Sequence, residues 1–223
     1  MLYFLLMFLS MFQTVIAPGR GTGAVASSVV SCVSGACQDS FIGVAGTTIN
    51  VHDANWRDYF STVQAVNIAL SGSGTAHCCS DGNAYHVGGG YYNSSTSDTS
   101  QLVILPYTDG AVSKIVCVRG DGVTTVGYCA QFGNASTGNW TKVSVFGPSY
   151  STVIEGSWSQ SINHTLKITA SGTGTVGITI TVDDTSLGTS TVTGSITDTG
   201  HPGFYITGDG NDADNYVGPW QDH

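Results

Sequence analysis

The chain has 223 residues, of which 41% are hydrophobic and only 9% are charged, and its formal net charge is −9 at pH 7. This length suits one sizeable domain, and so few charges are unusual for the surface of a cytosolic enzyme. Because its six Lys and Arg form no basic cluster, the negative charge would repel a polyanion, which argues against nucleic-acid binding.

The chain opens with an apolar run that ends at Ala17 and is too short to span a bilayer comfortably. Such a run is typical of a secretory signal, and Ala24 and Ala26 provide a small-x-small cleavage site. We therefore expect residues 1–26 to be a signal peptide or hydrophobic leader and the mature chain to be secreted. Retention as an anchor or burial is the alternative, because no Lys or Arg precedes the run. No other stretch predicts a membrane span.

Residues 27–40 are rich in Gly, Ala, Ser and Val. We expect an extended, strand-capable tail here, followed by one domain over 41–223. Short apolar or alternating runs separated by Gly, Asn and Asp then predict strands. The clearest runs are 101–105, 114–118, 125–132, 141–146, 165–170, 176–182, 189–193 and 203–207. Such regular spacing, without amphipathic helices between the runs, predicts an all-β, antiparallel two-sheet sandwich or jelly roll.

The chain has six cysteines, and an even number in an exported protein suggests disulfides. Cys32 and Cys37 could close a small loop, and Cys117 and Cys129 could form a cross-strand bridge. The adjacent Cys78 and Cys79 could reach different partners, or one of them could join two subunits. Zinc is the rival interpretation, but the paired C-x2-C spacing is absent.

Several segments together carry a resemblance to a known fold family. They are GTTINVHDANW at 46–56, VCVR at 116–119 with GYC at 127–129, LKITASG at 166–172 with ITVDD at 180–184, TGHPGFY at 199–205, and DNY at 214–216. In this order they resemble the concanavalin A-like, laminin-G-like jelly-roll domains of extracellular proteins, with 46–56 as the opening strand. Asp184 stands where that family usually has glycine. The resemblance implies two packed antiparallel sheets, but this fold serves lectins, hydrolases, adhesion modules and structural subunits alike.

The sequence offers little catalytic machinery. Glycosidases of this fold need two nearby carboxylates, whereas Glu155 is the only glutamate in the chain. Asp183 and Asp184 are adjacent, so in a strand they would point to opposite faces, and they are better explained as a turn. No Gly-x-Ser-x-Gly nucleophile motif occurs. We expect no catalysis, with a polysaccharide hydrolase or lyase as the remote alternative.

Three kinds of binding or modification site are candidates. Exposed aromatic rings could stack on sugars, and the candidates are Tyr91, Tyr92, Trp140, Trp158 and Trp220. An oxygen-rich segment could hold Ca²⁺ through Asp209, Asn211, Asp212 and Asp214, although a solvated loop explains it as well. Four N-x-S/T sequons could carry glycans, at Asn93, Asn134, Asn139 and Asn163.

The leading hypothesis is a non-catalytic, secreted structural or adhesive subunit, glycosylated and partnered by copies of itself. Residues 23–36 would add as a strand to a neighbour's sheet edge and build extracellular filaments. The alternative hypothesis is a carbohydrate-binding, lectin-like module whose partners are glycans.

Overall fold

The computed structural model describes residues 30–33, 36–58, 68–78, 86–93, 96–106, 112–120, 127–133, 142–146, 153–155, 158, 161–193, 200–208 and 216–223. For residues 86, 142–146, 153–155, 192–193 and 208 the description concerns the backbone alone. The predicted leader, residues 1–26, lies outside the described residues.

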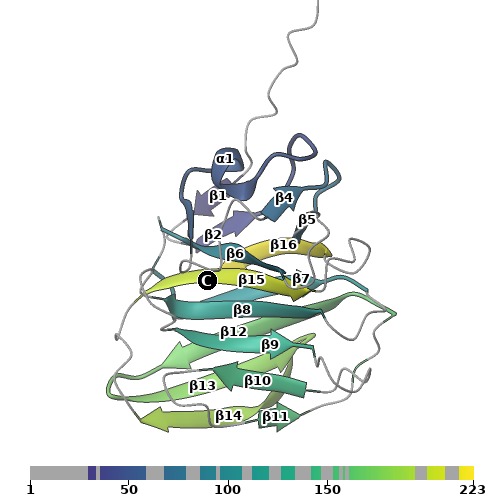
Figure 1. Cartoon of the computed structure of the whole chain (residues 1–223). Coiled ribbons are helices and arrows are strands. Elements are labelled where there is room, and N and C mark those ends of the chain that lie inside the picture. Colours follow the sequence, from purple (N-terminus) through teal and green to yellow (C-terminus); the bar gives the residue numbers. More distant parts are fainter. Residues whose placement is uncertain are drawn as a thin grey trace, which may run out of the picture.

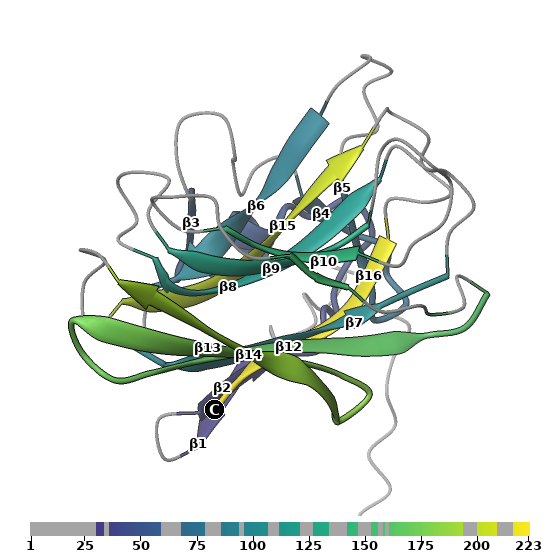
Figure 2. The ribbon, with the colours of Figure 1, turned by 90° about the horizontal axis from the view of Figure 1, so that it is seen from below.

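The described strands form two antiparallel sheets (Figure 1). Sheet A has nine strands, ordered β1 (Val30–Val33), β2 (Ala36–Asp39), β16 (Tyr216–Asp222), β7 (Thr99–Ile104), β12 (His164–Ser171), β13 (Thr175–Val182) and β14 (Thr185–Thr193), with β5 (Ala76–Cys78) on β16 and β4 (Ile68–Leu70) on β5. Sheet B has seven strands, ordered β11 (Val153–Glu155), β10 (Lys142–Phe146), β9 (Tyr128–Phe132), β8 (Ser113–Gly120), β15 (His201–Gly208), β6 (His86–Tyr92) and β3 (Trp56–Asp58). Figure 2 shows the two sheets stacked as layers. The predicted all-β sandwich is confirmed.

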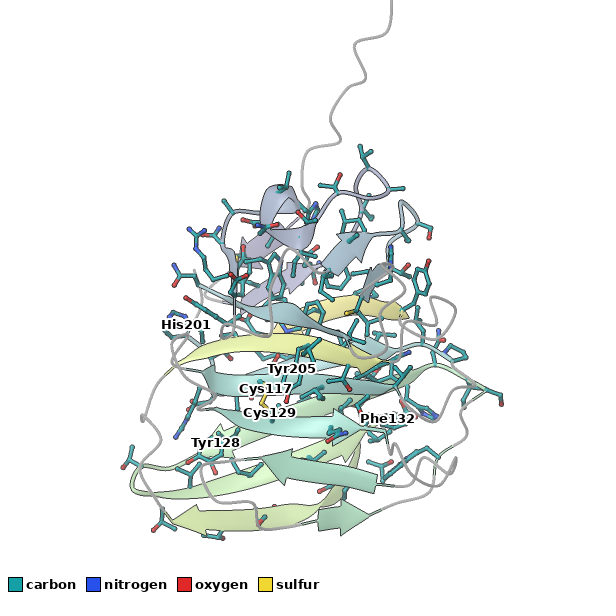
Figure 3. All side chains as sticks on the ribbon, viewed as in Figure 1. Cys117, Tyr128, Cys129, Phe132, His201 and Tyr205 are labelled. Carbon is teal, nitrogen blue, oxygen red and sulfur yellow. A yellow bond between two sulfur atoms is a disulfide. The ribbon has the colours of Figure 1, made fainter. Side chains whose placement is uncertain are left out.

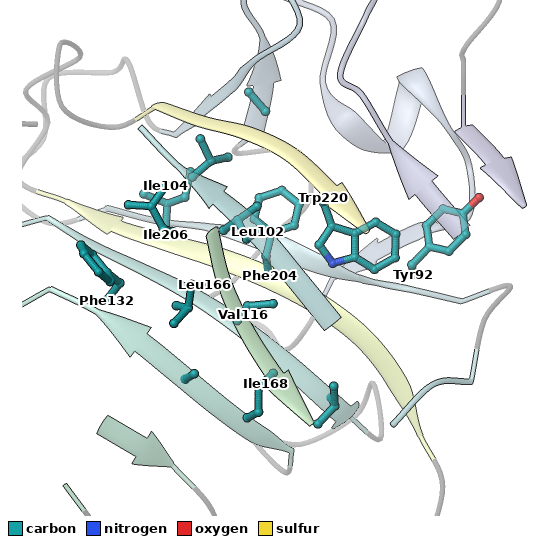
Figure 4. Close-up of a cluster of buried hydrophobic side chains, with 14 of the residues drawn as sticks. Tyr92, Leu102, Ile104, Val116, Phe132, Leu166, Ile168, Phe204, Ile206 and Trp220 are labelled. Carbon is teal, nitrogen blue, oxygen red and sulfur yellow. The ribbon is translucent and has the colours of Figure 1, made fainter. Parts of the chain in front are cut away.

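Strand periodicity builds the core between the sheets (Figure 4). In β12, Leu166 and Ile168 are fully buried while the residues between them are partly exposed. β13 repeats this pattern with Ile178 and Ile180. Sheet B contributes side chains such as Phe204 from its inner face. Each such side chain contributes roughly 1.5–3 kcal/mol by leaving water, so the alternation itself fixes which face of each strand is buried.

The hairpin between β13 and β14 turns at two aspartates. Asp183 and Asp184 have φ angles of 50° and 61°, which a two-residue turn of type I′ requires of both central residues. The Asp183 carboxylate also accepts a 2.8 Å hydrogen bond from the backbone N–H of Thr165. The adjacent aspartates therefore form a turn, as the sequence analysis argued.

One predicted strand is wrong in part. Residues 46–56 were expected to form an extended opening strand, but Ile49–His52 form the short helix α1. Ile49 and His52 are both buried, since residues three apart lie on one side of a helix. β3 begins only at Trp56.

The segment expected to be a tail pairs within the chain's own sheet. β1 and β2 form a hairpin closed by the Cys32–Cys37 disulfide, and β2 pairs with β16 near the other end of the chain. This hairpin lies with α1 and β4 at one end of the molecule (Figure 1). Residues 30–33 and 36–39 are therefore part of sheet A.

Buried polar groups connect separate segments of the sandwich at two positions. Asp39, fully buried, accepts hydrogen bonds from Trp56 Nε1 at 2.8 Å and from the backbone N–H of Phe41 at 2.8 Å, and it lies 3.1 Å from His52 Nε2. At another position, the buried Arg119 donates to both carboxylate oxygens of Asp98, at 2.6 and 2.9 Å. Both carboxylates are thus engaged in holding strands and loops together.

Candidate functional site

The outer face of sheet B collects the side chains that alternate with the core. Trp56, Tyr92, Val116 and Phe204 point inward, so their neighbours along each strand lie on the outer face. That face holds Arg57, Val87, Tyr91, Ser113, Ile115, Cys117, Cys129, Gln131, Tyr205 and Thr207. Figures 1 and 3 look onto this sheet.

The Cys117–Cys129 disulfide belongs to a small buried cluster on this face. Cys117 and Cys129 are paired across β8 and β9 and joined by an S–S bond. With Ile115 they form a small apolar cluster that is separate from the main core, and the partly exposed Val87, Tyr91 and Tyr205 pack against it. Figure 3 shows the disulfide beside Tyr205. The cluster gives the face a rigid apolar base.

Aromatic rings stand on that base. The ring of Tyr91 stacks on the imidazole of His201, with centroids 5.2 Å apart and an interplanar angle of 29°. Tyr205 lies on the same face from the neighbouring strand β15. Both tyrosines are half-buried, so part of each side chain remains accessible to solvent.

Polar groups border the rings. Gln131 Nε2 donates a 2.6 Å hydrogen bond to Ser113 Oγ, which orients the amide so that its carbonyl oxygen can accept a further bond. Thr207 stands opposite Ser113 in the β15–β8 ladder. Among the described side chains on this face there is no Asp or Glu. Stacking rings, an amide and hydroxyl groups are suited to binding a neutral or anionic polar ligand.

Glu155, the single glutamate, lies in the edge strand β11 of the same sheet, where its backbone is opposite Lys142. A hydrolytic pair would require a second carboxylate within about 5–10 Å. The described side chains of this face supply none.

Only part of the predicted aromatic set reaches this face. Tyr91 does, but Tyr92 is 2% exposed and Trp220 is fully buried, so the structure corrects the expectation that these two could stack on sugars. Their rings pack 5.4 Å apart in the core (Figure 4). Trp158 was expected to be exposed, but it is half-buried and packs on Phe132. Trp140 lies outside the described residues.

Tyr205 and His201 were missed by the sequence analysis. A signal for Tyr205 exists, because it alternates with the apolar Phe204 and Ile206 in a predicted strand and must face away from them. Nothing local indicates His201, because its stacking on Tyr91 depends on the pairing of β6 with β15.

The other predicted sites have mixed locations. Asn93 and Asn163 are exposed, so both sequons are accessible to modification, whereas Asn134 and Asn139 lie outside the described residues. The Ca²⁺ candidates, at 209–214, also lie outside them. In the described part of the chain, no group of three His, Cys, Asp or Glu is arranged to hold a metal. Cys78 is disulfide-bonded, but Cys79 is not described.

The buried histidines serve the fold. Asp39 raises the pKa of His52 through their hydrogen bond, while burial opposes the rise. His164 Nδ1 lies 2.6 Å from Asp183 Oδ2 at the β13–β14 turn, and its ring packs near Phe132. Neither histidine belongs to the outer face of sheet B.

No helix in the described ranges has the length and apolar character needed to cross a bilayer.

Comparison with known proteins shows the fold. No family model matches the sequence, and no curated protein matches it. Among solved structures, the Crh5 transglycosylase in complex with NAG superposes with a TM-score of 0.52 at 13% identity, covering 89% of this chain and 88% of that one. The potassium-bound carbohydrate recognition domain of Emp46p superposes with a TM-score of 0.50 at 10% identity, covering 78% of this chain and 91% of that one.

The sandwich is therefore a concanavalin A-like jelly roll, as the sequence resemblance implied. At these identities the likeness concerns the fold alone, since one fold serves many unrelated functions.

Proposed function

We propose that this protein is a glycan-binding module that holds its ligand on the outer face of sheet B. The observation that carries the proposal is the stacked pair of Tyr91 and His201, with Tyr205 beside it, above a rigid apolar base. Sugar rings present apolar C–H faces that pack on aromatic rings and hydroxyl rims that bond to amides and hydroxyls. The partly exposed amide of Gln131, held by its hydrogen bond to Ser113, is a group to which such a hydroxyl could bond.

Two further points support a glycan as the ligand. The face lacks described carboxylates, so it offers binding groups rather than an acid–base pair. The solved structures that share the fold include a transglycosylase and a carbohydrate recognition domain.

The test is binding to a panel of neutral and acidic polysaccharides, measured by affinity electrophoresis. Tyr91→Ala and Tyr205→Ala should each weaken binding about tenfold, which corresponds to about 1.4 kcal/mol. The matched control is Tyr216→Ala, because Tyr216 stacks on His77 in sheet A with a similar geometry, 4.9 Å and 31°. Equal losses in all three variants, or binding that none of them changes, would contradict the proposal.

Secretion and glycosylation belong to the same proposal. Disulfides persist in oxidising compartments, and the two in the described residues both join paired strands. Asn93 and Asn163 are exposed. Protein secreted by a eukaryotic host should lose mass on treatment with an N-glycosidase, and Asn163→Gln should remove part of that difference.

Self-assembly is the second candidate. It is favoured by the position of β1 at the edge of sheet A, where Val33 is 72% exposed, and by a shallow recess beside it that includes Ser31 and Gln221. A strand from a second copy could add to this edge. Because residues 30–33 and 36–39 already pair within the chain, the donor would have to be residues 23–29. A charge on an edge strand opposes such pairing, so Val33→Lys should abolish any filaments seen by electron microscopy.

The enzyme alternative has its own readout. If the protein turns over a polysaccharide and Glu155→Gln abolishes this turnover, the protein is a hydrolase or lyase. If the protein binds a polysaccharide and Glu155→Gln leaves the binding unchanged, the result supports a binding module.

A further inference from the structure

An arginine, Arg57, lies on the strand next to the Tyr91–His201 stack. β3 pairs with β6, and this register sets Arg57 directly opposite Tyr91. Because Trp56 and Tyr92 both face the core, Arg57 and Tyr91 both lie on the outer face of sheet B. Residues directly opposite in an antiparallel pair have Cβ atoms roughly 4.5–5.5 Å apart. One cation and one aromatic ring therefore stand side by side, with His201 stacked on that ring.

Arg57 differs from the two cations of β8, Lys114 and Arg119. Arg119 is buried and paired with Asp98, and Lys114 is buried with its Nζ 3.0 Å from the carbonyl oxygen of Leu105. Arg57 is exposed, and within the described part of the chain its guanidinium has no hydrogen bond or ion pair. Its five N–H donors are therefore available to a ligand.

We propose that Arg57 and Tyr91 form a subsite for an acidic sugar, one that carries a carboxylate or a sulfate group. The inference rests on the proposed function and names the class of glycan. The guanidinium donates two parallel hydrogen bonds to the anionic group, a geometry that suits carboxylates and other planar or tetrahedral oxyanions. The sugar ring packs on the aromatic stack beside it.

The net charge of −9 does not prevent this binding. Asp39 and Asp222 are buried in the core, and Asp98 and Asp183 are engaged with Arg119 and His164. Charges beyond the opposite sheet lie more than about 10 Å away, and at physiological ionic strength screening acts over about 8 Å. These four carboxylates are therefore occupied in the core or in ion pairs and do not compete with a ligand for Arg57.

Asp58 is the nearest acidic neighbour in sequence. It is exposed and follows Arg57 in β3, where its backbone stands opposite Gly90. Successive residues of a strand point to opposite sides, so Asp58 projects away from the side that Arg57 and Tyr91 share. It therefore leaves the proposed subsite without a competing carboxylate from its own strand.

The experiment compares three probes: polygalacturonate, which carries carboxylates; dextran sulfate, which carries sulfates; and neutral dextran. Their affinities are measured for the full chain and for two variants. Arg57→Gln removes the exposed cation opposite Tyr91 on sheet B, and Lys167→Gln is the matched control, because Lys167 lies on the outer side of β12 in sheet A. Thermal unfolding of each variant verifies that the fold is retained.

We expect the full chain to bind at least one acidic probe more tightly than dextran. Arg57→Gln should weaken that binding at least about fivefold, the scale of one solvent-exposed, charge-assisted contact, and Lys167→Gln should change it less than about twofold. Raising the salt concentration from 50 to 300 mM, values chosen to span about a twofold change in screening length, should reduce the difference between the full chain and Arg57→Gln.

The outcomes separate the two proposals. If Arg57→Gln binds the acidic probes as tightly as the full chain does, the proposed acidic subsite is wrong. A loss of binding in Tyr91→Ala would still support glycan binding. If the full chain binds none of the three probes but binds another neutral polysaccharide of the panel, the acidic subsite alone is wrong. Binding to no polysaccharide at all would overturn both.

Discussion

Tyr91 lies directly opposite Gly203 in the β6–β15 ladder, so the residue of β15 that is paired with it has no side chain. The ring stacks instead on His201, two residues before that glycine. A Cβ atom added to Gly203 would come within 2.3 Å of the Gly90 carbonyl oxygen. The glycine thus permits the close approach of the two strands that carry the aromatic rings.

This close approach predicts that Gly203→Ala is destabilising. The added methyl group meets backbone rather than a flexible side chain, so β6 and β15 would have to separate. We expect a loss of about 1–3 kcal/mol in the free energy of unfolding, measured by urea denaturation. Gly177→Ala in β13 is the control, because its nearest contact is the Ser171 hydroxyl at 3.1 Å. Equal effects of the two changes would show that the β6–β15 approach is not unusually tight.

The two buried tryptophan N–H groups should differ in their importance. Trp56 donates to the buried carboxylate of Asp39 at 2.8 Å, and Trp220 donates to the hydroxyl of Ser100 at 2.9 Å. Phenylalanine keeps most of the packing but removes the donor in each case. We expect Trp56→Phe to cost about 2–3 kcal/mol and Trp220→Phe about 1 kcal/mol, measured by denaturant titration. A larger loss for Trp220→Phe would contradict the role given to Asp39.

The His52–Asp39 contact predicts how stability depends on pH. The pKa of His52 is raised in the folded protein by its hydrogen bond to Asp39, so the folded state binds the proton more tightly than the unfolded state. The resulting stabilisation is fully present below the ordinary histidine pKa of about 6.5 and is lost as pH rises through the higher folded value. Melting temperatures between pH 5.5 and 8.5, a range from about 1 pH unit below to about 2 pH units above the ordinary histidine pKa, should show this decline.

The comparison for that experiment is His52→Asn. This variant removes the titrating group, so its melting temperature should decline less over the same range than that of the full chain. Parallel curves for the two proteins would mean that His52 does not contribute to the pH dependence.

The two described disulfides should contribute unequally to stability. Cys117–Cys129 joins residues 12 apart and Cys32–Cys37 joins residues 5 apart. In the chain-entropy account the longer loop gives about 3 kcal/mol and the shorter one about 2 kcal/mol. Paired Cys→Ala variants test this by denaturation. We also expect only the Cys117–Cys129 variant to weaken glycan binding, because that disulfide underlies Tyr91 and Tyr205.

Much of the fold was predictable because some strands have a clear alternating sequence pattern. β12 and β13 alternate apolar and polar residues over their full length, and Asp183–Asp184 form a two-residue turn between β13 and β14. In such a hairpin, pattern and turn chemistry agree. β16 was missed, because Gly218 and Pro219 interrupt its apolar pattern. The structure accommodates them at a register shift, with Pro219 exposed, where a missing N–H is tolerated.

The candidate site was less predictable, because it depends on faces and registers. Tyr91 and Tyr92 are adjacent and were equal candidates, yet one faces outward and the other the core. Only the pairing with β3 and β15 decides which is which. The same pairing brings Arg57 and His201 to Tyr91 from distant parts of the chain. Local sequence contains no signal for such long-range neighbours.

The most direct measurement of where a ligand binds is the mapping of backbone amide chemical shifts by NMR during titration with an oligosaccharide from the polysaccharide that binds best. The account predicts shifts at Tyr91, Gln131, His201 and Tyr205 on sheet B, with little change at Thr99, Lys167 and Thr179 on the outer side of sheet A. Shifts gathered on sheet A, with those four positions of sheet B unmoved, would contradict it.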